Sequence, residues 1–326
     1  MRAVVCKALG DIADLVVEDI PSPPLVPGSV RIAVDAAGIN FADTLIVAGR
    51  YQIRAVPPFV PGFEVAGTVV ECAPGVERCR PGDTVMALVE YGGFAEEVVA
   101  PQDCVFVLPA GVDAVQAAGF AVAYGTSHFG LKYRAGLTSG ETVLVNGAAG
   151  GVGLTAVEIG KRLGGVVIAT ASSQEKLAIA KAAGADHALD SRSENLREEI
   201  KDLTGGRGVD VVYDPVGGKL FEASLRATAP GGRVLLVGFA SGGVPQIPAN
   251  ILLVKNISAI GFYWGAFRRL DPIRMQQSCE ELVRWLGEGS VRPHISEVFP
   301  LSDAVAALRA LKDRRTTGKV VLRVGA

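Results

Sequence analysis

The stretch from Thr142 to Gly153 carries the clearest chemical signal in this 326-residue sequence. It reads Thr-Val-Leu-Val-Asn-Gly-Ala-Ala-Gly-Gly-Val-Gly, and apolar residues then recur at helical spacing as far as Leu163. In such a motif the glycines permit a tight turn, let backbone N–H groups approach a pyrophosphate and let the helix pack closely. The start of the helix adds N–H donors and a positive dipole end. We therefore expect a dinucleotide to contact Gly147, Ala149, Gly150, Gly151, Val152 and Gly153.

The end of the next expected strand, residues 166–171, distinguishes NAD from NADP. An NAD site usually places Asp or Glu there to bind the ribose 2′-OH. Here the chain continues Ser172-Ser173, and Lys176 follows. Two hydroxyls and an ammonium group suit a 2′-phosphate, and Arg192, beyond the third strand, adds a second cation. The sequence predicts NADPH as the cofactor.

The elements that position these residues alternate between strand and helix from about residue 140. This alternation predicts an α/β domain with a parallel sheet, helices on both faces and right-handed crossovers. We expect strands at 142–146, 166–171, 187–190, 209–213, 233–239 and 257–262, and helices at 176–183, 194–203 and 221–227.

Residues 1 to about 120 have a different pattern. Short Val- and Ala-rich runs are separated by Pro and Gly, which is typical of a barrel-like β domain. After residue 264 the sequence indicates a helix at 272–288, a helix at 304–311 and a closing strand at 319–324. Because the nucleotide-binding pattern is complete by residue 262, we expect this last part to return to the first domain.

Composition narrows the class of protein. Hydrophobic residues are 49% and charged residues 20%, as in globular proteins, and the net charge of −2 offers no basic field to nucleic acid or to an anionic membrane. No apolar run has transmembrane length, and no signal peptide is recognisable. Five scattered cysteines indicate reduced thiols, and we expect a cytoplasmic protein.

Five motifs together resemble those of the zinc-free medium-chain dehydrogenases/reductases of the quinone oxidoreductase (zeta-crystallin-like) type. They lie at residues 38–43, 61–67, 92–96, 148–153 and 316–321, so the resemblance covers essentially the whole chain. It implies a GroES-like β-rich catalytic domain, residues 1–122 and 264–326, and a Rossmann NADP-binding domain, residues 123–263. It also implies a cofactor cleft at their junction and a homodimer.

The residue types argue against zinc. Zinc-dependent relatives have Cys where Asn40 stands and His where Phe63 stands, and neither Asn nor Phe is a zinc ligand of the usual kind. The four-cysteine lobe of those relatives has no counterpart between Gly92 and Cys104. We therefore expect no metal site.

The resemblance also implies roles for residues outside the glycine turn. In similar enoyl-thioester reductases, a tyrosine at the position of Tyr51 is the proposed proton donor, although an aromatic wall of the substrate pocket is an equally good interpretation. Asn40 is expected near the nicotinamide ribose or the substrate oxygen, with turn capping as the alternative. Further cofactor contacts are expected from Thr126, Gly238, Phe239, Ser241, Phe262, Trp264 and Lys319.

Three functions remain open at this point. The first is an NADPH-dependent, zinc-independent reductase of quinones or other α,β-unsaturated carbonyl compounds, because hydride addition to a conjugated acceptor spreads charge to a distant oxygen. The second is an enoyl-thioester reductase acting on an acyl-CoA or acyl carrier. The third is a non-catalytic NADPH-binding or RNA-binding crystallin-like protein.

Overall fold

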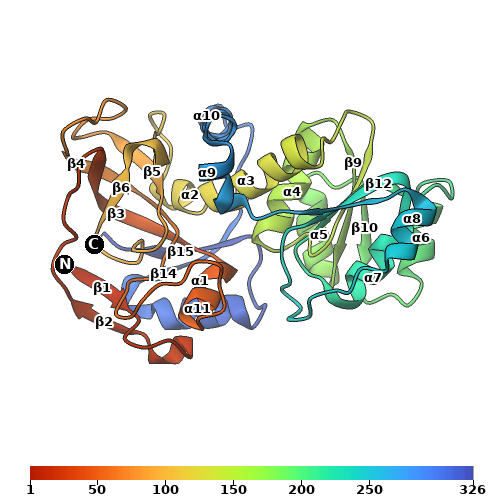
Figure 1. Cartoon of the computed structure of the whole chain (residues 1–326), viewed down its shortest axis with the longest axis horizontal. Coiled ribbons are helices and arrows are strands. Elements are labelled where there is room, and N and C mark those ends of the chain that lie inside the picture. The colour runs from red at the N-terminus through yellow and green to blue at the C-terminus, as the bar shows by residue number, and fades with distance from the viewer. Residues whose placement is uncertain (326) are drawn as a thin grey trace. The chain divides into compact units, whose positions relative to one another are not determined.

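The computed structural model describes residues 1–325 and divides into two compact units (Figure 1). Within the described residues, unit 1 combines Met1–Val122 with residues 279–325, and unit 2 is Ala123–Ser278.

Residues 264–278 belong to unit 2, whereas we expected them in the catalytic domain. Aromatic packing and one buried hydrogen bond explain this placement. The ring of Phe267 lies 4.5 Å from that of Phe129, and the Ser278 hydroxyl lies 2.7 Å from Nδ1 of His128. These contacts hold the start of α10 (Pro272–Gly287) against residues of unit 2.

Unit 2 is built on a six-stranded parallel sheet. Its strands are β8 (Thr142–Val145), β9 (Val166–Ala171), β10 (His187–Asp190), β11 (Val209–Asp214), β12 (Thr228–Leu236) and β13 (Ser258–Gly261). Its helices include α3 (Ala121–His128), which begins in unit 1, α4 (Gly151–Arg162), α5 (Gln174–Ala182), α6 (Leu196–Asp202), α7 (Gly218–Ala227), α8 (Ala249–Lys255) and α9 (Phe267–Leu270). The π-helical segment Phe129–Arg134 follows α3.

The strand order is β10-β9-β8-β11-β12-β13. Numbered along the unit, this is 3-2-1-4-5-6, the order of a doubly wound dinucleotide-binding sheet. The predicted parallel α/β domain is confirmed. The order reverses between β8 and β11, so the loops after these two strands flank the switch point where such sheets bind ligands.

The fifth strand differs from its expected bounds. It ends at Leu236 rather than at residue 239, because the N–H groups of Val237 and Gly238 both turn to the carbonyl of Asp214. The helix α8 had no counterpart in the expected elements.

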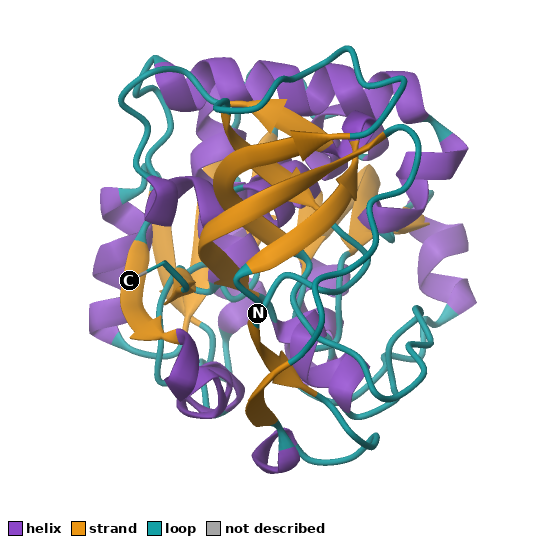
Figure 2. Ribbon diagram, turned by 90° about the vertical axis from the view of Figure 1, so that its left-hand side faces the viewer, coloured by secondary structure: helices purple, strands orange, loops and turns teal. Residues whose placement is uncertain are grey.

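Unit 1 contains a seven-stranded sheet of order β14-β15-β3-β4-β5-β7, in which β6 also pairs with β3, and a two-stranded sheet β1-β2 (Figure 2). The strands are β1 (Arg2–Val5), β2 (Val16–Asp19), β3 (Ser29–Ile39), β4 (Glu64–Cys72), β5 (Thr84–Leu88), β6 (Glu97–Pro101), β7 (Val105–Val107), β14 (Ile295–Pro300) and β15 (Lys319–Arg323). The helices are α1 (Phe41–Val47), α2 (Ala114–Ala118), most of α10, and α11 (Ala304–Lys312).

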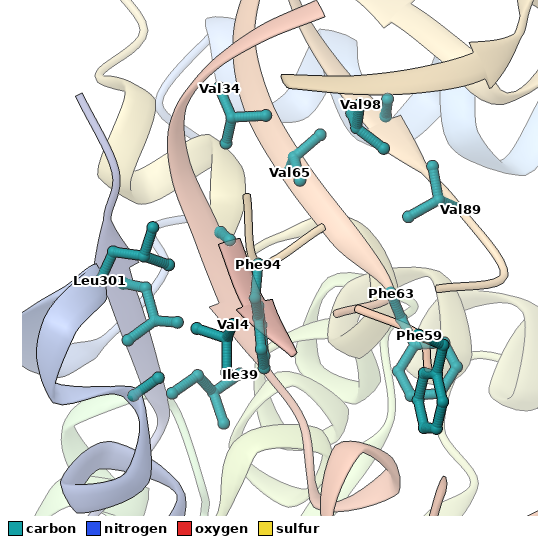
Figure 3. Close-up of a cluster of buried hydrophobic side chains, with 14 of the residues drawn as sticks. Val4, Val34, Ile39, Phe59, Phe63, Val65, Val89, Phe94, Val98 and Leu301 are labelled. Carbon is teal, nitrogen blue, oxygen red and sulfur yellow. The ribbon is translucent and has the colours of Figure 1, made fainter. Parts of the chain in front are cut away.

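The core of unit 1 joins its two chain segments. Val4, Ile39 and Phe94 come from the first segment and Leu301 from the second, and all four side chains are buried in one cluster (Figure 3). Burying an aliphatic or aromatic side chain of this size contributes about 1.5–3 kcal/mol. β15 pairs with β3, Val320 opposite Ile39, which brings residue 319 to the start of α1.

The helix α1 lies in a region for which we expected only strands. Its start is marked by the carboxylate of Asp43, which accepts the N–H of Asn40 at 2.7 Å. This is one half of a capping box, with Asp in place of the usual Glu. In the sequence, the signal for this helix was the pair Asn40 and Asp43, two polar residues three positions apart.

Candidate functional site

The loop between β8 and α4 contains glycines of two kinds. Gly147 has φ +61°, a conformation that L side chains rarely adopt, and a Cβ on Gly153 would lie 2.2 Å from the carbonyl oxygen of Gly147. Gly150 has ordinary angles, φ −82° and ψ 173°, and a Cβ there would meet only the Gly147 oxygen, at 3.4 Å. The fold itself therefore needs glycine at 147 and 153. At Gly150 the absence of a side chain leaves space that a bound molecule could occupy.

The start of α4 presents backbone donors beside this space. The N–H of Leu154 makes the first bond of the helix, to Gly150, at 2.8 Å. The N–H groups of Gly151, Val152 and Gly153 precede it, and α4 has neither a side-chain cap nor an acidic residue in its first turn. A twelve-residue helix with a start of this kind attracts anions.

The remaining residues of the motif are fixed by their surroundings. Ala149 is buried, and its neighbour Ala148 donates its N–H to Thr170 of β9 at 2.9 Å. The carbonyl of Val152 accepts the Ser127 hydroxyl at 3.0 Å. The loop is therefore held from β9 and from α3.

A buried polar network, which we did not expect from the sequence, ties the strands together at the switch point. Nδ2 of Asn146 donates to Asp214 and to Ser224, both at 3.0 Å, and Thr170 lies 3.3 Å from Oδ1 of Asn146. The Asp214 carboxylate also accepts the N–H groups of Val216 and Gly217. Burial raises the pKa of Asp214, and these donors oppose the shift. The sequence did carry a signal for this network. Asn146 follows β8 and Asp214 ends β11, and these two strands are neighbours at the point where the strand order reverses.

The end of β9 carries the hydroxyl groups expected for a 2′-phosphate. Ser173 caps α5, with its hydroxyl oxygen accepting the N–H of Lys176 at 3.3 Å, while Ser172 is exposed and Lys176 is half-buried. Because a hydroxyl that accepts one bond can still donate another, Ser173 keeps a donor for a ligand.

Arg192 is held by a neighbouring acid. Its guanidinium donates to Asp190 through Nε at 2.9 Å and Nη2 at 2.7 Å, and Arg192 holds the pKa of Asp190 down at about 2. Asp190 stands opposite Ala171 in the sheet register, so a carboxylate lies next to the end of β9. The sequence of β9 itself has no acid at this end. Asp190 reaches it through the parallel pairing of β9 with β10, which cannot be predicted from the sequence alone.

The segment after β12 lies at the same sheet edge as the glycine loop. This segment contains Gly238, Phe239 and Ser241 and packs against the loop after β11. The N–H of Ala240 donates to the carbonyl of Pro215, and the N–H of Ser241 donates to the carbonyl of Val216. Phe239 is 39% exposed, and a Cβ on Gly217 would lie 3.3 Å from its ring. Since the carboxyl ends of parallel strands share one edge, this segment is available to the same ligand as the glycine loop.

Thr126 lies in α3, and the next residue, Ser127, fixes this helix to the rest of unit 2. The Ser127 hydroxyl lies 2.7 Å from that of Thr155 and 3.0 Å from that of Tyr213. Thr126 itself is 8% exposed.

Phe262 and Trp264, the first and third of the three aromatic residues that follow β13, are mostly buried. Phe262 is stacked with Phe129 at 6.2 Å in an aromatic cluster that also contains Phe267. The Trp264 ring occupies the space beside Gly125, where a Cβ would lie 2.2 Å from Cζ2. Nε1 of Trp264 is buried and has no hydrogen-bond partner in the described chain. Aromatic packing therefore explains the position of Phe262, whereas the indole N–H of Trp264 is a hydrogen-bond donor that the described chain does not use.

Unit 1 buries a charged cluster at the junction of β3 and α1. Nζ of Lys319 donates to the Ile39 carbonyl at 2.7 Å, to Oδ1 of Asn40 at 2.7 Å and to Oε1 of Glu64 at 2.8 Å. Nδ2 of Asn40 donates to the same Glu64 oxygen at 2.8 Å, and the other Glu64 oxygen accepts the N–H of Val122. All three Lys319 donors are therefore satisfied by protein acceptors, although we had expected this ammonium to reach the cofactor.

Asp43 completes this cluster. It is fully buried, and its two oxygens accept the N–H groups of Asn40 and Gly62 at 2.7 and 3.0 Å. Burial raises the pKa of Asp43 to about 7 against the opposing effect of these donors and of Lys319. The Asp43 carboxyl group therefore changes charge near neutral pH.

Tyr51 follows α1 and is half-buried. Its ring lies 5.3 Å from that of Phe63, at 56°, and Phe63 directly precedes Glu64 of the charged cluster. The aromatic pair and the polar cluster are thus neighbours within unit 1.

Residues 1–325 contain neither a metal-ligand cluster nor a membrane-spanning helix. No three His, Cys, Asp or Glu side chains gather there as a metal ion would require. No helix in that range combines the length and the apolar character needed to cross a membrane.

Comparison with known proteins adds two family matches. Residues 26–110 match the alcohol dehydrogenase GroES-like domain, and residues 151–287 match the zinc-binding dehydrogenase family.

Individual relatives match over nearly the whole chain. A quinone oxidoreductase-like protein 2 homolog of Nematostella vectensis is 43% identical over 98% of this chain and 88% of that protein. The solved quinone oxidoreductase of Thermus thermophilus, described also in complex with NADPH, is 38% identical with a TM-score of 0.87, over 99% of this chain and 100% of that one. A mycoketide-CoA synthase of Mycobacterium tuberculosis is 35% identical over 96% of this chain, but over only 7% of its own length.

Proposed function

Since the chain belongs to the quinone oxidoreductase branch of the medium-chain dehydrogenase/reductase family, we propose that it is an NADPH-dependent reductase of quinones or other α,β-unsaturated carbonyl compounds. The observation that carries this proposal is the space at Gly150 beside the donor groups of α4. A nucleotide diphosphate fits this combination of open space, N–H groups and positive helix end.

The donor set of unit 2 suits NADPH, whose nicotinamide supplies a hydride when the cofactor is bound. The glycine loop holds the diphosphate, and Ser172, Ser173 and Lys176 hold the 2′-phosphate. The exposed ring of Phe239 contributes apolar surface at the same sheet edge. Arg192 contributes less than we expected from the sequence, because its guanidinium is paired with Asp190.

The residues of unit 1 favour chemistry without zinc. Asn40 and Phe63 stand where zinc-dependent relatives have ligands, and the Asn40 amide is bonded to Lys319 and Glu64. Without a Lewis acid, a simple ketone is hard to reduce. A conjugated acceptor is easier, because hydride adds to carbon while the negative charge spreads to a distant oxygen, which then takes a proton.

Tyr51 is the proposed donor of that proton. Phenols ordinarily keep their proton at pH 7 and can act as general acids. Phe63 supports the Tyr51 ring, and the Lys319–Glu64–Asn40 cluster fixes the loop from which α1 and Tyr51 follow. Asn40 therefore acts by positioning this segment.

The test is NADPH oxidation in the presence of 1,4-benzoquinone, a naphthoquinone and a small enone. Tyr51→Phe is expected to lower kcat by at least about 100-fold for the enone, as loss of a general acid does, while NADPH affinity stays unchanged. Tyr91→Phe is the matched control, because Tyr91 is 43% exposed in the same unit and packs on Phe59 instead. Absence of turnover with every acceptor would refute the proposed function, and normal turnover by Tyr51→Phe would remove Tyr51 from the mechanism.

A second candidate is the reduction of an enoyl thioester. The similarity to one segment of a mycoketide-CoA synthase favours it, because the name of that enzyme states a CoA product. Crotonyl-CoA in the same assay separates the two. A kcat/KM for crotonyl-CoA well above that for every quinone would make the thioester the preferred class, and binding of NADPH with no turnover of either class would favour the non-catalytic alternative.

We also propose that the protein works as a homodimer. In the described chain β13 is hydrogen-bonded only to β12, which leaves one sheet edge for a second copy. Light scattering coupled to size-exclusion chromatography is expected to give twice the chain mass of 33.8 kDa.

A further inference from the structure

A pocket of about 290 Å³ in unit 2 is lined mainly by positive side chains. Arg197 and Lys201 come from α6, Arg226 from α7 and Lys255 from α8, and the three helices are drawn together at one end of unit 2 in Figure 1. We call this feature the basic pocket. Asn250, Ile251 and Val254 complete its lining, and no carboxylate of residues 1–325 contributes to it.

Lys255 is anchored inside the basic pocket. Its Nζ donates to the carbonyl oxygens of Arg226 at 2.8 Å and Thr228 at 2.5 Å, which leaves one of its three N–H groups for another acceptor. Burial lowers the pKa of Lys255, and the nearby charges of Lys201 and Arg197 lower it further. Like charges are therefore held close together at this point.

The surroundings compensate these charges only weakly. Arg197 lies 3.8 Å from Glu198, an ion pair in which both side chains are well exposed, so it contributes little. Neither Lys201 nor Arg226 forms an ion pair within the described residues. The last turns of three helices also meet here, but each helix end carries only about half a negative charge. Positive charge remains in excess.

The basic pocket is separate from the proposed nucleotide site. α6, α7 and α8 each lead into the next strand, so their C-terminal ends lie at the amino-terminal edge of the sheet; Thr228, which binds Lys255, is the first residue of β12. The glycine loop follows the carboxyl end of β8, at the opposite edge. The nucleotide chemistry therefore leaves these cations unexplained.

We propose that the basic pocket binds a phosphorylated small molecule as a second ligand, with the phosphoryl oxygens on Lys201, Arg226 and Lys255 and the organic part against Ile251 and Val254. The cations gather in a hollow of small-molecule size, and the net charge of −2 gives the chain no overall positive field that would attract a polyanion. Phosphate oxygens accept several charge-assisted hydrogen bonds at once, which matches cations contributed by three helices.

Calorimetric titration with inorganic pyrophosphate tests this proposal, with citrate as a second multivalent anion. Pyrophosphate is expected to bind, and Lys201→Ala and Arg226→Ala are each expected to weaken that binding about tenfold, as loss of one charge-assisted contact does. Lys181→Ala is the matched control, because Lys181 is an exposed cation in the last turn of α5 and lies outside the pocket. Its affinity for pyrophosphate should equal that of the wild type.

Gly150→Ala separates this site from the glycine loop, where pyrophosphate can also bind. Binding weakened by Lys201→Ala and Arg226→Ala but kept in Gly150→Ala supports the basic pocket. Binding lost only in Gly150→Ala, binding unchanged in the two pocket variants, or no binding at all would overturn the proposal. Citrate binding as tightly as pyrophosphate, with the same sensitivity to both variants, would overturn its restriction to phosphoryl groups.

Discussion

The two kinds of glycine in the β8–α4 loop give a prediction that separates folding from cofactor binding. Gly150→Ala and Gly153→Ala each add one methyl group three residues apart. At Gly153 the methyl carbon would lie 2.2 Å from the Gly147 oxygen, whereas at Gly150 its nearest neighbour is 3.4 Å away. We expect Gly153→Ala to damage the fold. We expect Gly150→Ala to leave the fold intact and to weaken NADPH binding.

The magnitudes follow from these distances. An atom at 2.2 Å must move by about 1 Å to reach van der Waals contact, and overpacking of this kind costs about 1–3 kcal/mol. At roughly 2–4 °C per kcal/mol, the Tm of Gly153→Ala should fall by several degrees. Gly150→Ala is unstrained at φ −82°, but its methyl group would block the diphosphate from the N–H groups, and losing one charge-assisted contact weakens binding about tenfold.

Two measurements decide the outcome. Thermal unfolding without cofactor reports the fold, and calorimetric titration with NADPH reports the site. A wild-type Tm for Gly153→Ala would contradict the packing argument. Wild-type NADPH affinity for Gly150→Ala would show that the diphosphate does not occupy this space, and the proposed cofactor site would then be wrong.

Three further perturbations test the remaining groups. Lys176→Ala is expected to weaken NADPH binding about tenfold and to leave NADH binding unchanged, since only NADPH carries the 2′-phosphate; titration with both cofactors measures this. Lys319→Met leaves the fully buried Glu64 without its counter-charge and should lower the free energy of unfolding by about 3–5 kcal/mol in urea titrations. For Asp43, the folded protein keeps the carboxyl proton up to about pH 7, whereas the unfolded chain releases it near the ordinary pKa of 3.8. Its protonation therefore contributes stability that is complete below pH 3.8 and is lost as the pH rises through 7. The difference in unfolding free energy between wild type and Asp43→Asn should fall across this range.

Controls make these tests specific. An equal loss of NADH and NADPH affinity in Lys176→Ala would mean that the ammonium does not recognise the 2′-phosphate. Adding Glu64→Gln to Lys319→Met should recover much of the lost stability, because the uncompensated charge is removed; no recovery would assign the loss to packing. If the difference in unfolding free energy between wild type and Asp43→Asn does not change from pH 3.8 to about 7, Asp43 does not titrate in this range.

Much of the proposed site was predictable because its signals are local in the chain. The glycine turn, its flanking strand and helix, and the hydroxyl-rich end of β9 lie within 35 residues of one another, and backbone sterics give each glycine its meaning without knowledge of the rest of the fold. The residue types at Asn40 and Phe63 likewise argue against zinc ligands wherever the fold places them, because neither side chain has the donor atom that zinc prefers. The strand–helix alternation was sufficient for the parallel sheet, although it did not reveal α1 or α8.

The tertiary structure decided which polar groups are free to act. Lys319 is buried against Ile39, 280 residues away in the chain, so its ammonium is satisfied by the protein itself. Arg192 is paired with an acid whose position depends on the register of β9 with β10, and the basic pocket exists only because α6, α7 and α8 end close together. A charged side chain acts through the partners within a few ångströms of it. For these residues the partners come from distant segments, and only the packing of the folded chain brings them into range.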